Sequence, residues 1–371
     1  MQIKYIEGFA GIGGFRLGFE QACAELSIES KCVFAFEKDR FARQTYLANF
    51  FEEPAGDITK IPSKDITGRK HKDDILFFFA GFPCQPWSTA GKQKGVDDER
   101  DMIPQVVRII LDKQPDVFIL ENVKGLKSKK FKDVYDRLMW DLKVICGYTI
   151  YERIYNAKAV VPQNRERVFI VGFRKPVNFE FPELPALYPV LKDVLEFENV
   201  PEKYFLKEKT FQAIKDNQNN KNHNYGFNIG DFKKVAHTIT ARYGNDGAEC
   251  LIPGLKKIGF IGKGRQGEKI YDINGIAITQ CALGGNGGGA KGLYAIPEIN
   301  DGIEHIVDYS RVRKLMPREC ARVMGFSDDF KIVVSDSQAY RQFGNAVVPG
   351  VVKEICKAVI LRYDKIYKKL I

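Results

Sequence analysis

The chain has 371 residues, of which 44% are hydrophobic and 12% aromatic, and this composition excludes a mainly disordered protein. Its 57 Lys and Arg residues exceed its 47 Asp and Glu residues, and the resulting net charge of +10 favours a polyanionic partner such as nucleic acid. No apolar run is long enough to span a membrane and the N-terminus lacks a secretory pattern, so we expect a cytoplasmic protein.

Strand-like and helix-like patterns alternate over residues 3–175. Residues 75–80 (ILFFFA) form a continuous apolar run, which is typical of a strand buried on both faces. The alternation predicts a parallel, doubly wound α/β sheet with ligands at the carboxyl ends of its strands. The expected strands are 4–7, 32–36, 75–80, 117–120 and 168–172, and the expected helices are 15–26, 41–50, one that includes 106–111, and 134–145.

The character of the sequence changes after this region. Prolines crowd the stretch from Pro176 to Pro189, and the following segment is rich in glycine with short β-like runs. From Ser310 the pattern is helical again, and residues 351–370 are expected to form a C-terminal helix. We therefore expect one domain from residues 1–190 and 311–371, with the C-terminal helix folded back onto it, and a smaller β-rich domain from residues 191–310.

A glycine-rich turn, Phe9-Ala10-Gly11-Ile12-Gly13-Gly14, follows the first expected strand. Glycines in such a turn let the backbone approach a ligand at a helix N-terminus. The third glycine of the dinucleotide fingerprint GxGxxG is absent. Glu37 ends the second strand, where a ribose is bound in this type of sheet, and Asp57 is expected to end a third strand. These residues favour a cofactor that contains adenosine, although a purely structural turn is the alternative.

Cys84 lies in Gly-Phe-Pro-Cys-Gln-Pro-Trp-Ser (81–88), directly after the buried strand. A cysteine at the carboxyl end of a strand can act as a nucleophile if its thiolate is favoured. The other cysteines lie in apolar or helical contexts and are expected to be inert. Glu121 follows the next strand and is expected at the same edge of the sheet. Arg165 and Arg167, two apart on an extended segment, are expected to point the same way and to bind an oxygen or a phosphate. Cysteine and histidine spacings indicate no metal site.

Together these segments resemble the DNA cytosine-5 methyltransferase family. FAGIGG, GDI, GFPCQPWS, ENV, QNRER, RKLMPRECARVMGF and QFGNAVVP occur in the order of that family, and the resemblance covers essentially the whole chain. It implies a Rossmann-like catalytic domain and makes residues 191–310 a target-recognition domain. Residues 259–280 are also similar to the recognition domain of the enzyme that methylates GCGC.

The resemblance implies a role for each matched residue. Cys84 attacks C6 of a flipped-out cytosine in a short, specific duplex sequence, and the resulting covalent adduct takes a methyl group at C5 from S-adenosylmethionine, leaving S-adenosylhomocysteine. Glu121 contacts N3 and the amino group, Arg165 holds O2, and Arg167 supports the cysteine loop. The residues implied to bind the cofactor are Phe9, Gly11, Ile12, Gly13, Glu37, Asp57, Ile58, Asn345 and Val347.

The chain departs from the family pattern at two positions. Glu7 stands where an Asp is usual, and Lys38 stands where a Trp often stacks on adenine. For DNA, residues 253–271 carry five basic side chains against Glu268, and residues 124–132 (KGLKSKKFK) form a second basic stretch that is either a phosphate surface or a solvated face. The residues implied to contact DNA are Ser88, Lys92, Arg100, Gln266, Lys269 and Thr279.

Three alternatives remain beside a DNA methyltransferase. A tRNA cytosine-5 methyltransferase shares the catalytic motifs but has a shorter recognition segment. A non-catalytic DNA-binding regulator has no need of Cys84, and the incomplete fingerprint disfavours an NAD-dependent oxidoreductase. We expect a monomer of bacterial or phage origin that acts on double-stranded DNA, uses no metal, and belongs to a restriction-modification system whose cognate endonuclease acts separately.

Overall fold

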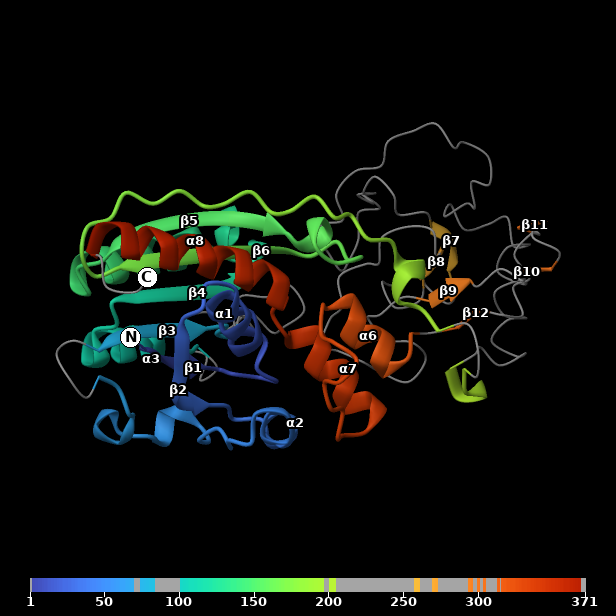
Figure 1. Ribbon diagram of the computed structural model, residues 1–371, viewed down its shortest axis with the longest axis horizontal. Helices are drawn as coiled ribbons and strands as arrows, with labels where there is room; N and C mark the ends of the chain where they lie inside the picture. The colour runs from blue at the N-terminus through green and yellow to red at the C-terminus, as the bar shows by residue number, and fades with distance from the viewer. Residues whose placement is uncertain are drawn as a thin grey trace. The chain divides into compact units, whose positions relative to one another are not determined.

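The computed structural model describes residues 2–69, 74–83, 101–196, 200–204 and 315–367, together with six short strands between residues 257 and 313. The chain divides into two units (Figure 1). The first comprises Met1–Ala157, Glu166–Pro185 and Ala346–Ile371, and the second comprises Lys158–Arg165 and Ala186–Asn345. Which residues form the catalytic domain and which form the target-recognition domain stays a prediction.

A six-stranded sheet in the order β2-β1-β3-β4-β6-β5 forms the centre of the first unit. β1 pairs in parallel with both β2 and β3, and β3 pairs in parallel with β4. Because β1 has its successor β2 on one side and β3 on the other, the strand order reverses at β1, which is where such sheets bind ligands. The strands are β1 (Gln2–Gly8), β2 (Glu29–Phe36), β3 (Ile75–Ala80), β4 (Val117–Val123), β5 (Thr149–Asn156) and β6 (Glu166–Phe173).

The expectation of an all-parallel sheet is wrong at one edge. β6 runs antiparallel to both β4 and β5, and β5 was not anticipated as a strand. A short segment without a long helix joins β5 to β6, and such a connection returns the chain antiparallel, whereas a parallel return needs a long crossover. The sheet is therefore mixed, and the doubly wound, Rossmann-like character holds for β1 to β4.

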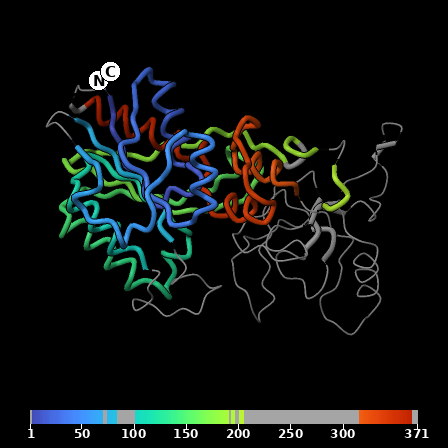
Figure 2. The backbone as a smooth tube through the Cα atoms, turned by 90° about the horizontal axis from the view of Figure 1, so that it is seen from below, coloured from blue at the N-terminus to red at the C-terminus, as the bar shows by residue number. Residues whose placement is uncertain are grey.

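Helices cover both faces of this sheet. Successive residues of β3 point to opposite faces, as the pleat requires. Phe77 and Phe79 pack against Phe19 of α1, whereas Phe78 belongs to a core shared with α3 and α4. Figure 2 shows α8, in red, and the blue-green helices α3 and α4 on opposite sides of the sheet. The helices of this unit are α1 (Gly14–Glu25), α2 (Arg40–Phe50), α3 (Ile103–Lys113), α4 (Lys132–Trp140) and α8 (Pro349–Tyr367).

The C-terminal helix α8 packs closely on α1. A Cβ added at Gly18 would lie 2.5 Å from the carbonyl oxygen of Pro349 and 2.6 Å from Cβ of Val352, so the helices approach to a distance that only glycine permits. Glu25, at the end of α1, accepts ion pairs from Lys353 and Lys357. Helix α8 is thus part of the first unit and packs on α1.

Two sequence expectations for smaller elements need correction. Asp57 does not end a strand, because the segment before it makes a single parallel bridge, between Ala55 and Phe36. Asp57 instead begins a short 3-10 turn, Ile58–Lys60, and its carboxylate accepts from the backbone N–H of Thr59. The helix expected over 134–145 is α4 followed by a π-helical turn, Asp141–Ile145.

The described part of the second unit contains the α-helices α6 and α7 and two small sheets. Helices α6 (Pro317–Val323) and α7 (Asp336–Asn345) enclose a cluster of Phe326, Phe330 and Phe343. Four strands pair in the order β12-β9-β8-β7, and β10 pairs with β11. These strands are β7 (Lys257–Phe260), β8 (Lys269–Asp272), β9 (Leu293–Ala295), β10 (Ile299–Asn300), β11 (Ile303–Glu304) and β12 (Val312–Arg313). None of the helices described in either unit is long and apolar enough to cross a membrane.

Candidate active site

The carboxyl ends of β1, β2, β3 and β4 lie at one edge of the sheet. Gly8 is in register with Phe36 of β2 and Ala80 of β3, and Ala80 is in register with Leu120 of β4. The residues that follow each of these four positions are therefore neighbours along the edge. They are the glycine-rich turn after β1, Glu37 after β2, Gly81-Phe82-Pro83 after β3, and Glu121-Asn122 in β4.

The backbone of the glycine-rich turn adopts left-handed conformations, which residues with a Cβ atom rarely adopt. Phe9, Gly11 and Gly13 have φ angles of 53°, 55° and 85°, in the left-handed region. Phe9 is held in this conformation by edge-to-face packing on Phe36, with ring centroids 5.1 Å apart. A Cβ at Gly13 would lie 2.1 Å from the Phe50 ring, and one at Gly14 would lie 2.7 Å from the carbonyl oxygen of Val347. The turn leads directly into the N-terminus of α1, which begins at Gly14.

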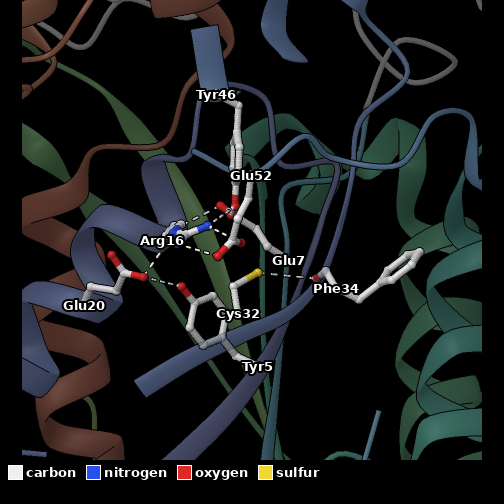
Figure 3. A network of polar contacts seen from close by, with 8 residues as sticks. All are labelled: Tyr5, Glu7, Arg16, Glu20, Cys32, Phe34, Tyr46 and Glu52. Carbon is white, nitrogen blue, oxygen red and sulfur yellow. Dashed lines mark hydrogen bonds and ion pairs between the residues drawn. The ribbon is translucent and has the colours of Figure 1, made fainter. Parts of the chain in front are cut away.

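A buried polar network connects the elements that flank this turn (Figure 3). Glu7 of β1 is fully buried, and its two carboxylate oxygens accept from the backbone N–H of Arg16, at 3.1 Å, and from the hydroxyl of Tyr46, at 2.8 Å. The Arg16 guanidinium contacts Tyr46 and forms ion pairs with Glu20 and Glu52. Burial raises the pKa of Glu7 to about 7, against the two hydrogen bonds, which lower it. This network links β1, α1 and α2 around the turn.

Glu37 reaches from the end of β2 to the glycine-rich turn. Its Oε2 accepts from the backbone N–H of Gly11 at 2.9 Å, and its Oε1 accepts from the backbone N–H of Asp39 at 2.8 Å. Burial raises the pKa of this carboxyl, while hydrogen bonds from the backbone of Asp39, Gly11 and Lys38 oppose the shift. A carboxylate has about four acceptor positions, so capacity remains for donors such as ribose hydroxyls.

Asp57 lies near the same end of β2, and Lys38 forms an ion pair with it at 2.8 Å. The pairing with Lys38 lowers the pKa of Asp57. Sequence reasoning named both residues separately but did not anticipate their contact. The side chains of Ile12 and Ile58 are buried, so backbone atoms are what these residues can offer a ligand. Val347 packs on Gly14 in the first unit, whereas Asn345 is exposed at the end of α7 in the second.

Glu121 occupies a part of β4 that extends beyond β3. β3 ends at Ala80, opposite Leu120, so from Glu121 onward β4 pairs with β6 alone among the described strands. The Glu121 carboxylate forms an ion pair with Arg167 of β6 at 3.0 Å, and both side chains are less than a fifth exposed. A Cβ at Gly81 would lie 3.6 Å from Glu121 Oε2. The carboxylate therefore lies beside Gly81, which comes three residues before Cys84 in the sequence.

Asn122 holds residues 81–83, the described segment after β3, against β4. It is buried, and its Nδ2 donates to the carbonyl oxygen of Phe82 at 3.1 Å, two residues before Cys84. Its Oδ1 accepts from the backbone N–H of Val123. Sequence reasoning included Asn122 in the ENV motif without assigning it a role. A polar side chain next to an apolar strand run was the available signal.

Arg165 and Arg167 contact different groups. Arg167 contacts Glu121 in the first unit. Arg165 is 2% exposed in the second unit, and its Nη2 donates to the carbonyl oxygen of Gly344 at 3.1 Å. Gln163 is also buried and donates to the carbonyl oxygen of Val323. Each arginine is thus held by a contact within its own unit, and the expected common direction of the two side chains stays a prediction.

Several predicted site residues lie outside the described part of the chain. These are Cys84, Ser88, Lys92, Arg100, Gln266 and Thr279. Lys269 begins strand β8, for which the backbone alone is described. Among the cysteines that are described, burial raises the pKa of Cys23 and Cys32 to about 12 and that of Cys146 to about 11, so all three are poor nucleophiles. Within the described residues, no three His, Cys, Asp or Glu side chains gather where they could hold a metal ion.

Comparisons with known proteins agree with this arrangement. The type II methyltransferase M.HhaI of Haemophilus parahaemolyticus is 35% identical over 358 residues, covering 95% of this chain and 93% of that protein. M.HpaII of Haemophilus parainfluenzae is 35% identical over 379 residues, covering 99% and 91%. Among solved structures, the Entamoeba histolytica methyltransferase EhMeth has a similar fold, with a TM-score of 0.67, 19% identity and 99% of both chains covered.

The model of the family described as C-5 cytosine-specific DNA methylase matches residues 3–361. This match spans the glycine-rich turn, Glu37, the Glu121–Arg167 pair and α8 as far as Leu361. The chain therefore belongs to the family of C-5 cytosine-specific DNA methylases.

Proposed function

We propose that the protein methylates C5 of a cytosine flipped out of a short, specific duplex DNA sequence, through a covalent bond between Cys84 and C6. The observation that carries this proposal is the Glu121 carboxylate, fixed by Arg167 beside the first residues of the Cys84 loop. The relatives named above are type II methyltransferases. We therefore also propose that the chain is the modification enzyme of a restriction-modification system and acts as a monomer, with a separate endonuclease.

The residues at the ends of β1 and β2 fit S-adenosylmethionine. The left-handed backbone of Gly11 and Gly13 permits close approach at the N-terminus of α1. Glu37 is fixed by two backbone donors and keeps acceptor capacity for ribose hydroxyls. Asp57, beside Ile58, offers a carboxylate for the adenine amino group, and the backbone around Asn345 and Val347 completes the site in this proposal. When bound, S-adenosylmethionine supplies an electrophilic methyl group.

Cys84 acts as the nucleophile in the proposed reaction. A thiolate is both a good nucleophile and a competent leaving group, so a bond to C6 can form and later break. Attack at C6 moves an electron pair toward C5 and N3 of the ring, and C5 becomes the nucleophilic carbon. After C5 carries the methyl group, a base removes the C5 proton, the C5–C6 double bond forms again, and Cys84 leaves as thiolate.

Glu121 and the arginines position the base. Glu121 contacts N3 and the amino group of the cytosine and stabilises the ring as charge develops. Arg167 keeps the Glu121 carboxylate in place, which reduces reorganisation during the reaction. Arg165, buried and anchored on Gly344, binds the base O2 in this proposal. Asn122 sets the start of the cysteine loop through Phe82.

The DNA contacts follow from the chemistry of the target. The reacting carbons are stacked inside a duplex, so the base must leave the stack before Cys84 can reach it. Ser88, Lys92 and Arg100 follow Cys84 in the sequence and are proposed to contact the DNA. Gln266, Lys269 and Thr279 are proposed to contact the recognition sequence.

A covalent trap tests the mechanism without knowledge of the recognition sequence. We would amplify a long duplex with 5-fluoro-2′-deoxycytidine triphosphate, so that every candidate cytosine of the new strands carries fluorine at C5. Fluorine replaces the proton that must leave C5, so elimination is blocked and the protein stays bonded to DNA. With S-adenosylmethionine, wild-type protein should form a complex that survives denaturing electrophoresis, whereas Cys84→Ala should form none. Cys146→Ala is the matched control and should form the complex, and an adduct with Cys84→Ala would refute the proposed nucleophile.

A further inference from the structure

The turn that begins at Asp57 is held by helix α3, which follows it by about 50 positions in the sequence. Ile58 is 3% exposed, and its side chain belongs to the same core as Val106 and Ile110 of α3. Arg108 lies on the same helix, and its Nη2 donates to the carbonyl oxygen of Ile58 at 3.1 Å. Residue 58 is therefore fixed both by its side chain and by its backbone.

Arg108 is itself held in one orientation. Its Nε donates to Oε1 of Gln105 at 2.9 Å, and its Nη1 donates to Oγ of Ser63 at 2.7 Å. Ser63 begins the next 3-10 turn, and its carbonyl oxygen accepts from Lys113 at 2.6 Å. A guanidinium is planar and its donors have fixed directions. The three contacts of Arg108 therefore fix where the Ile58 carbonyl lies relative to α3.

The turn offers an acceptor and a donor at successive residues. A carboxylate has about four acceptor positions. Oδ1 of Asp57 accepts from the backbone N–H and the hydroxyl of Thr59, and Oδ2 accepts from Lys38, so within the described residues one position remains on Oδ2. The backbone N–H of Ile58 is at the first position of the turn, where an N–H has no partner inside the turn. An acceptor next to a donor matches the edge of adenine that carries the 6-amino group and N1.

We propose that Arg108 is a positioning residue for the adenine of the cofactor, because it holds Asp57 and Ile58 where they accept from the 6-amino group and donate to N1. The inference rests on the proposed function in taking S-adenosylmethionine as the cofactor. Arg108 acts through the Ile58 carbonyl and contacts neither the cofactor nor the cytosine in this proposal. Its contribution therefore belongs to the selectivity of cofactor binding and not to the methyl-transfer step.

The test compares two ligands that differ only at this edge of the base. S-adenosylhomocysteine carries the 6-amino group, whereas S-inosylhomocysteine carries a carbonyl there and a hydrogen on N1, so donor and acceptor are exchanged. Isothermal titration calorimetry measures both dissociation constants for wild type and for Arg108→Met, which keeps an apolar stem and removes the donors. Reversing two contacts should make wild type prefer S-adenosylhomocysteine by about 100-fold, and misplacing one of them in the variant should reduce this ratio to about 10-fold.

Two further variants separate the position of the turn from stability and from charge. A general loss of stability weakens both ligands equally and leaves their ratio unchanged. Lys113→Ala is the matched control, because it removes one positive charge and one hydrogen bond of the same helix, to Ser63 and not to Ile58, and it should keep the wild-type ratio. Arg108→Lys keeps the charge and one donor group, so its ratio should lie between those of wild type and Arg108→Met. It also provides the test if Arg108→Met does not fold.

The possible outcomes distinguish this inference from the proposed function. The wild-type ratio in every folded Arg108 variant, or an equal decrease in Lys113→Ala, would overturn the inference. If wild-type protein binds neither ligand, the proposed cofactor and this inference fail together. If wild-type protein binds S-adenosylhomocysteine and S-inosylhomocysteine equally well, the inference alone fails.

Discussion

Replacing Gly13 with alanine tests the geometry of the glycine-rich turn. Gly13 has φ +85°, and an alanine in the left-handed region costs about 1–2 kcal/mol. The added Cβ would also lie 2.1 Å from Cε2 of Phe50. That ring is not free to move away, because it packs on Tyr46 and on the Arg16 guanidinium. Overpacking of this kind costs about 1–3 kcal/mol. We therefore expect Gly13→Ala to lower the free energy of unfolding by about 2–5 kcal/mol.

Gly11→Ala is the matched control for this change. Gly11 has φ +55°, but the nearest atom that an added Cβ would meet beyond its chain neighbours is the carbonyl oxygen of Phe9, at 4.0 Å. The control therefore carries the backbone strain without the clash, and should cost about 1–2 kcal/mol. Urea unfolding of both variants, followed by circular dichroism, measures the difference. Equal losses in the two variants would refute the packing of Phe50 against the turn, and no loss in either would refute the turn itself.

Three further predictions follow from the site. Burial raises the pKa of Glu7 from 4.5 to about 7, so the protonated carboxyl stabilises the fold at low pH. The free energy of unfolding should therefore decrease by up to about 3 kcal/mol as the pH rises from 4.5 through 7. Urea titrations of Glu7→Gln should lack this part of the pH dependence. Arg167→Ala removes from Glu121 a charge-assisted contact of about 1.5–3 kcal/mol, so kcat for methyl transfer should fall about 10- to 100-fold. Arg167→Lys keeps the positive charge and should recover part of the lost rate. Equal rates for wild type and both variants would mean that the pair has no role. Once the recognition sequence is known, a duplex mismatched at the target cytosine should bind more tightly than the matched duplex in anisotropy titrations, because less pairing energy is lost, and equal affinities would argue against base flipping.

The parts of the fold that local patterns describe were predictable. The run ILFFFA predicted a strand buried on both faces, and all six residues of β3 are buried. FAGIGG predicted a tight turn, because glycine tolerates the left-handed backbone found at Gly11 and Gly13. The position of Glu37 followed from the rule that strand ends share one edge. The first two of these signals depend on residues that are neighbours in the sequence, and the third depends on a general rule for parallel sheets.

The remaining features depend on contacts between distant residues. Strand β5 carries Glu152 and Arg153 at the edge of the sheet, so its pattern is weakly apolar, and the reversal of β6 follows from a short connection that alternation alone does not reveal. The Glu7–Tyr46 hydrogen bond spans 39 positions. A charged residue in the middle of the apolar strand KYIEGF signals that some partner exists, but one sequence does not say which.

The most direct test of the account is the pattern of cytosine methylation that the chain produces. Plasmid DNA is taken from a host that lacks cytosine methylation and expresses either the wild-type chain or Cys84→Ala, and both samples are sequenced after bisulfite treatment. We predict protected cytosines at one position of one short sequence with the wild-type chain, and none with Cys84→Ala. Complete conversion of every cytosine with folded wild-type protein, or equal protection by Cys84→Ala, would contradict the account.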